Sequence, residues 1–277
     1  MAQGPTGLIV AESSQGIGVY NAGTRILQTY EMGYSETRLG IGGTASGVIA
    51  AIENYTGRDT WDIVLLNART GSEIKRLGMS RPYGFPTSAV AVSSDASTIA
   101  FSVDEYDENL DERIEQTLVA QVSTLAGLGL AGAKDPVFIG NELLVQVGDR
   151  LHMLDANLDD QGDLGVTVNE RIGAASGSRD GRYIAYENGD AIWVLDRRTQ
   201  ATWAATNSVR RRFAPAFSPD GQYLAMLGGY GNRVAGAYVY IIKFEPSVTV
   251  NVTDEYTVES SNDGAVPGGG RIVWVEA

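Results

Sequence analysis

The chain has 277 residues, no cysteine and a formal net charge of −13 at pH 7. The lack of cysteine excludes disulfides, thiolate metal sites and cysteine nucleophiles. The acidic balance argues against nucleic acid as a partner, because phosphate contacts need clustered cations. A hydrophobic fraction of 43% indicates a folded globular protein.

The start of the chain bears on its location. Residues 1–20 lack a basic segment followed by an apolar run, so we expect no signal peptide in this chain. No apolar stretch approaches the roughly 18 residues of a membrane span, so we expect no membrane insertion. These features favour a cytoplasmic or virion-associated protein, although the compartment stays open.

Internal repeats organise the sequence. Three segments, beginning at Ala91, Gly177 and Ala216, each carry a turn followed by alternating apolar residues. In the clearest copy Pro219 presets φ, Asp220 can bond its own backbone and Gly221 tolerates a positive φ. Each segment therefore predicts a β-hairpin connection that leads into a strand. The turn aspartates of the three copies are Asp95, Asp180 and Asp220.

The spacing of these strands predicts the architecture. Their apolar centres are Ile9, Ile49, Ile99, Leu144, Ile184 and Leu224. The gaps between them run from 40 to 50 residues, which is the period of propeller blades. Further strands are expected at 16–21, 62–68, 150–156, 191–197 and 237–243. The pattern predicts an all-β, six-bladed β-propeller that fills residues 1–277 as a single domain.

The two ends of the chain complement each other. The first unit begins at Gly7 with no room for an inner strand ahead of it, and a Gly-rich loop at 260–270 leads to a last strand from Arg271. We expect the N- and C-terminal strands to complete one blade together. Such pairing would remove exposed sheet edges.

The segment FSPDGQYLA at 217–225, with its weaker copies SRDGRYIA and SSDASTIA, resembles the repeat of TolB and related WD40-like propellers. The resemblance implies the propeller fold. Members of this fold include periplasmic scaffold proteins, peptidase-associated domains and components of phage tails, so the resemblance implies no single function.

The third unit is longer than the others and strongly acidic. We expect its extra residues, which begin at Glu105, to extend a hairpin, with a short helix as the alternative because Leu110 and Ile114 are four residues apart. This run could meet a basic partner or a divalent cation, or form a solvated loop. The candidate partner-binding residues here are Asp104, Glu105, Asp107 and Glu108.

A basic cluster enters the innermost strand of the sixth unit. Guanidinium groups facing the central channel could grip a carboxylate or phosphate. They could equally pair with acidic neighbours and brace the propeller. The candidate partner-binding residues of this cluster are Arg210, Arg211 and Arg212.

Catalytic patterns are weak. His152 is the only histidine, and no G-x-S-x-G motif accompanies it. Residues 155–163 imitate the start of a calcium loop, but Asp160 replaces the turn glycine and Val166 the bidentate glutamate, so a polar turn is expected. The glycines of GIGGTASG at 40–47 predict a loop between the first two blades. We expect no catalytic residue and no cofactor, with calcium as an alternative.

The sequence therefore favours a non-catalytic interaction or structural module with protein partners, for example a part of a phage tail or virion. One alternative is a TolB-like cellular scaffold or sensor that binds a peptide at the channel mouth. Another is a propeller-type hydrolase with a calcium-dependent channel site.

Overall fold

The fold is described from a computed structural model. The structure describes residues 5–13, 16–24, 26–31, 37–43, 47–54, 60–80, 85–107, 112–168, 175–207, 211–228, 238–250, 256–258 and 271–276. All regular structure in these ranges is β-strand. No helix of the described chain has the length and apolarity to cross a membrane.

The described strands form six four-stranded antiparallel sheets. The first sheet contains β1 (Leu8–Ser13), β2 (Gly16–Asn21), β3 (Ile26–Glu31) and β24 (Ile272–Val275). The second contains β4 (Thr37–Gly43), β5 (Val48–Asn54), β6 (Thr60–Asn67) and β7 (Glu73–Ser80). The third contains β8 (Phe85–Val92), β9 (Thr98–Asp107), β10 (Glu112–Gln121) and β11 (Gly127–Ala131).

The second half of the chain repeats this plan. The fourth sheet contains β12 (Ala133–Ile139), β13 (Glu142–Val147), β14 (Arg150–Leu154) and β15 (Asp160–Thr167). The fifth contains β16 (Ala175–Gly177), β17 (Tyr183–Asn188), β18 (Ala191–Asp196) and β19 (Ala201–Ala204). The sixth contains β20 (Arg212–Phe217), β21 (Tyr223–Gly228), β22 (Tyr238–Lys243) and β23 (Tyr256–Val258).

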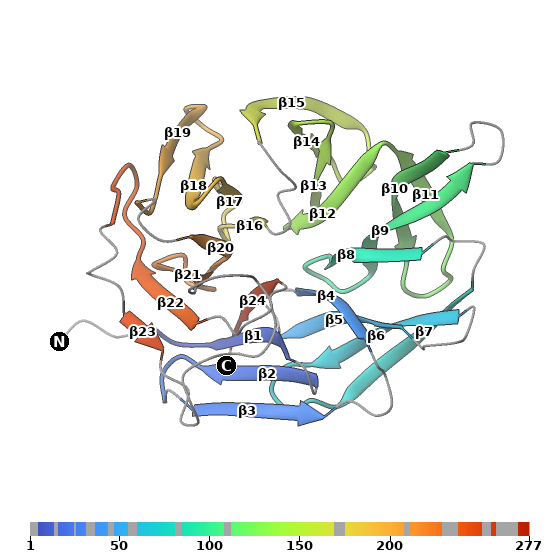
Figure 1. Ribbon diagram of the computed structural model, residues 1–277, viewed down its shortest axis with the longest axis horizontal. Helices are drawn as coiled ribbons and strands as arrows, with labels where there is room; N and C mark the ends of the chain where they lie inside the picture. The colour runs from blue at the N-terminus through green and yellow to red at the C-terminus, as the bar shows by residue number, and fades with distance from the viewer. Residues whose placement is uncertain are drawn as a thin grey trace.

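The sheets are arranged around a common centre (Figure 1), with one edge strand of each sheet innermost. The innermost strands are β24, β4, β8, β12, β16 and β20. Each of them contacts the next, and β24 contacts both β20 and β4. In the first sheet the innermost strand comes from the far end of the chain, because β24 pairs with β1 and sets Leu8 opposite Val275.

The strands predicted from the repeat are confirmed. All six apolar centres lie in the second strand of a sheet, next to the innermost one. The further strands expected at 16–21, 62–68, 150–156, 191–197 and 237–243 correspond to β2, β6, β14, β18 and β22.

The repeated turn is held by one hydrogen-bond pattern. In the link from β20 to β21, Ser218 Oγ donates to Asp220 Oδ1 at 2.6 Å. The backbone N–H of Gln222 donates to the same oxygen at 3.0 Å, and Tyr223 N–H donates to Ser218 Oγ at 2.9 Å. The pairs Ser178–Asp180 and Ser93–Asp95 repeat the arrangement. The serine and aspartate thus bond the turn's own polar groups.

The acidic third unit extends a hairpin, as predicted. β9 and β10 have ten residues each and pair along their whole length, from Asp107 opposite Glu112 to Thr98 opposite Gln121. The helix alternative is wrong for the described part of this hairpin.

The first half of the glycine-rich segment at 40–47 differs from its prediction, and residues 44–46 lie outside the described residues. Residues 40–43 belong to β4 and form no loop. Gly42 lies where β4 meets β8, and a Cβ there would overlap the carbonyl oxygen of Val90. Glycine at this position therefore allows two inner strands to approach, a packing demand that the local sequence does not reveal.

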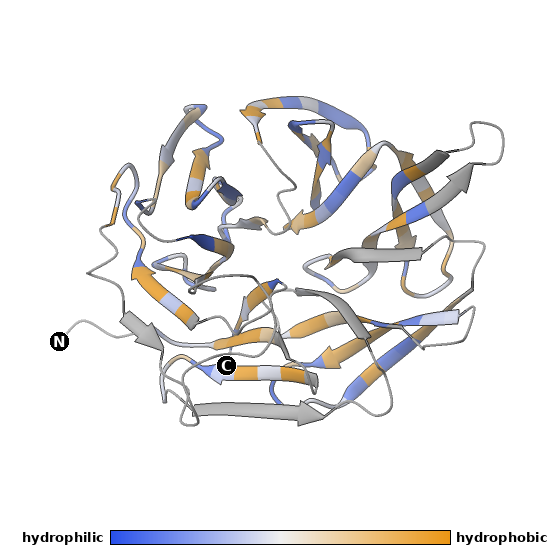
Figure 2. Ribbon diagram, in the orientation of Figure 1, coloured by the Kyte–Doolittle hydropathy of each residue, from blue (hydrophilic) through white to orange (hydrophobic). Residues whose placement is uncertain are grey.

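The core lies between the faces of neighbouring sheets. One cluster joins Ile9, Tyr20 and Trp274 of the first sheet to Phe213 and Leu227 of the sixth, and similar clusters join other neighbouring sheets. Figure 2 shows the corresponding apolar bands along strands such as β1, β5 and β6. Each fully buried aliphatic side chain contributes about 1.5–3 kcal/mol, so contact between sheets is a large stabilising contribution.

Candidate functional site

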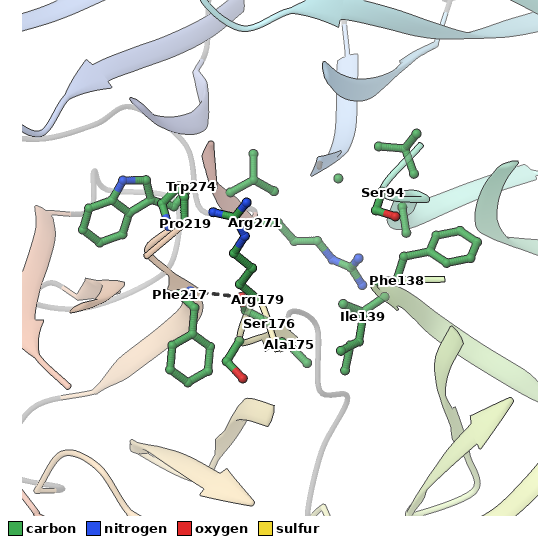
Figure 3. A pocket seen from close by; sticks show the side chains of 18 of the residues that line it. Ser94, Phe138, Ile139, Ala175, Ser176, Arg179, Phe217, Pro219, Arg271 and Trp274 are labelled. Carbon is green, nitrogen blue, oxygen red and sulfur yellow. Dashed lines mark hydrogen bonds between the residues drawn. The ribbon is translucent and has the colours of Figure 1, made fainter. Parts of the chain in front are cut away.

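A cavity of about 530 Å³ occupies the centre of the molecule. All six innermost strands line it, so no single repeat creates it. The strands contribute, among other residues, Gly42, Val90, Ile139, Ser176, Phe217 and Ile272. The wall is mainly apolar, and Phe217 N–H donates to Ser176 Oγ across two neighbouring strands (Figure 3).

The repeated turns also reach this cavity. The residue immediately before the turn aspartate lines it in all three copies: Ser94, Arg179 and Pro219. The turn therefore places one variable side chain per copy at the central opening. Among the three, only Arg179 carries a charge.

Arg271 is the buried cation of the site and is 6% exposed. Its Nη1 donates to Pro136 O at 3.1 Å and to Val90 O at 3.3 Å. Its Nη2 lies 3.5 Å from Oδ1 of the fully buried Asp135. These contacts join the segment entering β24 to β8 and β12, so Arg271 links three inner strands across the cavity.

Asp135 is held in place by an irregularity of β12. The register of β12 against β13 shifts between Lys134 and Val137, and Asp135 has a φ of 51°, which is uncommon outside glycine. Its N–H donates to Ser102 Oγ at 3.0 Å. This bond fixes the backbone of Asp135, while Arg271 is the partner of its buried carboxylate, and removing one member of a buried ion pair destabilises strongly.

Arg179 is the accessible cation. Its Nη1 lies 3.4 Å from Glu276 Oε1, and the two side chains are 67% and 46% exposed. Exposed ion pairs of this kind contribute little, typically below about 1 kcal/mol. A carboxylate from another molecule can therefore replace Glu276 at low cost. Figure 3 shows Arg179 and Arg271 within the space that the inner strands enclose.

The two described residues of the predicted arginine cluster lie elsewhere. Arg212 is fully buried, with its guanidinium carbon 4.1 Å from the centre of the Tyr240 ring, and does not reach the cavity. Arg211 Nη2 lies 3.1 Å from Glu187 Oε1. These contacts favour the bracing alternative for both residues. Arg210 lies outside the described residues, and its partner-binding role stays a prediction.

Within the predicted acidic group, the described side chain of Asp104 is separate from the cavity too. Asp104 lies in β9 opposite Glu115, and Glu105 and Asp107 follow on the same strand. Glu108 lies outside the described residues. Asp104, the member of the group whose side chain is described, does not line the central cavity, and a binding role for the group stays a prediction.

The remaining candidates have structural surroundings. His152 on β14 has its Nδ1 3.2 Å from Asp160 Oδ2. Asp155 Oδ1 accepts hydrogen bonds from the N–H groups of Asn157 and Asp159, which forms a polar turn between β14 and β15. Within the described ranges, no three acidic or histidine side chains gather as a metal site would require.

Comparisons with known proteins find similarity in the fold and no significant match in the sequence. No protein-family profile matches the sequence, and no curated protein resembles it significantly. The structure of TolB from Acinetobacter baumannii matches with a TM-score of 0.67 at 16% identity, over 98% of this chain and 67% of TolB. The β-propeller domain of Cps50 (Swd1) from Myceliophteria thermophila matches with a TM-score of 0.53 at 12% identity, over 85% of this chain and 79% of that one.

The fold is a TolB-like β-propeller. The propeller also matches a chain from the nidogen/laminin complex, with a TM-score of 0.69 at 9% identity over 96% of this chain and 97% of that chain. That protein takes part in a complex with another protein. At such identities the likeness establishes the propeller fold, while the site has to be argued from its own residues.

Proposed function

We propose that this propeller is a non-catalytic protein-interaction module whose central cavity binds an acidic segment of a partner protein. The observation that carries the proposal is Arg179, an exposed cation at a central cavity in an otherwise acidic protein. Its present partner Glu276 occupies the position that an incoming carboxylate would take.

The cavity offers two kinds of contact. Its walls present apolar side chains such as Val92, Phe138 and Ile272, which suit an aliphatic or aromatic side chain. Arg179 supplies a planar, bidentate donor for a carboxylate. Arg271 already serves the protein's own carbonyl groups and Asp135, so its part is to brace the cavity. The proposal requires no metal or cofactor.

The architecture proposed with this function is one closed ring of six blades, formed by residues 1–277 as a single domain. Pairing of β24 with β1 and the contact of β24 with both β20 and β4 support closure. The Gly-rich segment 260–270 lies outside the described residues, and its role as a loop before β24 stays part of the proposal.

The wider setting proposed is a larger assembly. The idea that this assembly is a phage tail or virion rests on analogy of fold alone. A TolB-like cellular scaffold would use the same cavity, so the two settings differ in the partner and share the site. The mass of the native particle, measured by light scattering, would separate a stoichiometric complex from a monomer.

The binding proposal is tested with defined peptides. An acetylated Phe-Val-Asp-Leu-Asp peptide, labelled with a fluorophore, should bind the wild-type protein, and Arg179→Glu should weaken binding at least about tenfold, since a charge-assisted hydrogen bond is replaced by repulsion. Titration by fluorescence anisotropy measures the dissociation constant.

Arg150→Glu is the matched control. Arg150 is 37% exposed and pairs with Asp163 on the outer part of the fourth sheet, outside the cavity. Its reversal changes the net charge equally and should leave binding within about twofold. Equal loss in both variants, or no loss in Arg179→Glu, would refute the cavity as the site.

A further inference from the structure

The outer edge of the third sheet differs from the edges of its neighbours. No described strand pairs with the far side of β11, whose only described partner is β10. β11 has the sequence GLGLA, without charge or proline, and Leu128 is 53% exposed. Unpaired edges of this kind accept further strands unless charges protect them.

The comparable outer strands carry that protection. β7 contains Glu73, Lys75 and Arg76, and β15 contains Asp160 and Asp163. β19 and β23 have only four and three residues. β3 has six residues and ends at Glu31. Among the described outer strands of five or more residues, β11 is the one without a charged residue.

The backbone N–H and C=O groups of the smallest residues of β11 point away from β10. Gln121 N–H donates to Ala126 O, and Gly132 N–H donates to Glu115 O. Residues of an antiparallel strand bond alternately inward and outward, so Leu128 and Leu130 bond β10. The N–H and C=O groups of the three intervening residues therefore face away from the sheet, and these residues are Gly127, Gly129 and Ala131.

A cavity beside this edge fits an apolar side chain. It has a volume of about 180 Å³ and lies on the face of the third sheet that meets β7, between Met79, Phe101, Leu118 and Leu125. Gly127 and Gly129 stand opposite Ala120 and Leu118 on this face and bring no side chain to fill it. Apolar cavities of about 150 Å³ accept ligands of the size of benzene.

The other face of the same edge is more polar. A cavity of about 480 Å³ there is bordered by Leu128 together with Ser97, Gln121 and Asn141. An added strand would thus meet an apolar wall on one face and polar groups on the other. Alternate side chains of a strand point to opposite faces, so alternation of apolar and polar residues suits this edge.

We propose that β11 is a docking edge for an extended, basic segment of a partner protein, which adds to the third sheet as a fifth strand. β11 would supply the backbone bonds, and the 180 Å³ cavity would select an apolar side chain at alternate positions.

Charge and area select this occupant over a second copy. Two chains that each carry −13 repel one another, and pairing of two five-residue strands buries far less than the roughly 1,200 Å² of a stable interface. Beyond Ala131, which stands opposite Gln116, β10 continues through residues 115–112, which contain two glutamates and one arginine and so add one net negative charge to that of the whole chain. An antiparallel segment begins beside Ala131, so its basic residues belong at its N-terminal end.

A synthetic peptide tests the docking edge. Acetyl-Lys-Lys-Val-Thr-Val-Thr-Val-amide should bind the intact protein, and a version with Glu in place of both Lys should bind at least about fivefold more weakly. Ala131→Pro removes one outward N–H and leaves the ladder to β10 intact, because proline is tolerated where the N–H of an edge strand faces solvent. This variant should lose about five- to tenfold in affinity.

A second variant closes the cavity. Gly129→Val places a side chain on the cavity face, where its Cβ would displace only the end of the flexible Gln116 side chain. It should weaken binding of the same peptide by about tenfold, since one apolar side chain loses its site. Circular dichroism establishes that both variants are folded.

Thr202→Pro is the matched control on another outer strand. Ala205 N–H donates to Ile192 O, so the register of β19 directs the amide of Thr202 away from β18. This exposed position should leave peptide affinity within about twofold. Equal binding by wild type and Ala131→Pro, absence of peptide binding, or dimers of the peptide-free protein would overturn the proposal.

Discussion

The first and fifth sheets reach the same four-stranded result by different routes. The fifth uses residues 175–204 in unbroken order, each strand pairing with the one before it. The first joins residues 8–31 to residues 272–275 from the opposite end of the chain. A local sheet needs only good turns, whereas the first sheet must also close a loop of more than two hundred residues. Local sequence can therefore specify the one and not the other.

Removal of β24 should have the largest effect, because the first sheet depends on this distant strand and the fifth sheet does not. Deletion of residues 271–277 strips the first sheet of the buried Ile272, Trp274 and Val275 and removes Arg271 from beside Asp135. We expect the melting temperature to fall by about 10–20 °C, which corresponds to a loss of about 5 kcal/mol or more. Differential scanning calorimetry measures the change.

A peptide of residues 271–277 added in trans serves as the control and should recover part of the loss. A deletion variant with an unchanged melting temperature would contradict the proposed closure of the ring, because the first sheet would then be stable without its inner strand.

Truncation of equivalent core residues in the first and fifth sheets should have the next largest effect. Ile9 in β1 and Ile184 in β17 are both almost fully buried. Truncation to alanine should cost about 2–5 kcal/mol at either site. Because the first sheet needs the distant β24, we expect Ile9→Ala chiefly to accelerate unfolding and Ile184→Ala to slow folding as well.

Stopped-flow kinetics with denaturant distinguishes these effects. If both substitutions divide their destabilisation between folding and unfolding rates in the same proportion, the two sheets form at the same stage of folding. The expected kinetic difference between the sheets would then be wrong.

The smallest effect concerns the local turns themselves. The hydroxyl of Ser93 and then the N–H and hydroxyl of Ser97 lower the pKa of Asp95 to about 2. A folded pKa below that of the unfolded chain contributes stability above pH of about 4, and this contribution is lost as the pH falls toward about 2. Ser93→Ala should raise the pKa of Asp95 and weaken this pH dependence.

Carbon-detected NMR titration of the Asp95 carboxyl measures the shift, with Ser94→Ala as the neighbouring control. A pKa of Asp95 that is the same in wild type and Ser93→Ala would show that another group holds the carboxylate.

Much of the architecture was predictable because short segments of the sequence specify its strands and turns. The Ser–x–Asp turns and the alternating residues around Ile184 and Leu224 are short-range signals. They identified the second strand of three sheets directly, and the repeat spacing located the other three. Residues 40–43 were wrongly expected to belong to a loop. Glycine is required at position 42 because the backbone of Val90, which is distant in sequence, leaves no room for a side chain there.

The candidate site was less predictable for the same reason. Arg271 meets Asp135 and Val90 only when three sheets assemble, and no motif surrounds it. Arg179 did leave a signal, since it occupies the turn position that Ser94 and Pro219 occupy in the other copies. A charged residue at one copy of a repeated, inward-facing turn position could have indicated the site from sequence.

The pairing of Leu8 with Val275 has a consequence for protein engineering. β1 starts and β24 finishes at the same end of the first sheet, so chain entering and chain leaving the propeller do so as neighbours. A host protein could thus carry this domain within a surface loop with little separation of the loop's two ends. By the same geometry, a short linker between the original ends and a new opening between β15 and β16 should give a circular permutant whose first sheet is continuous.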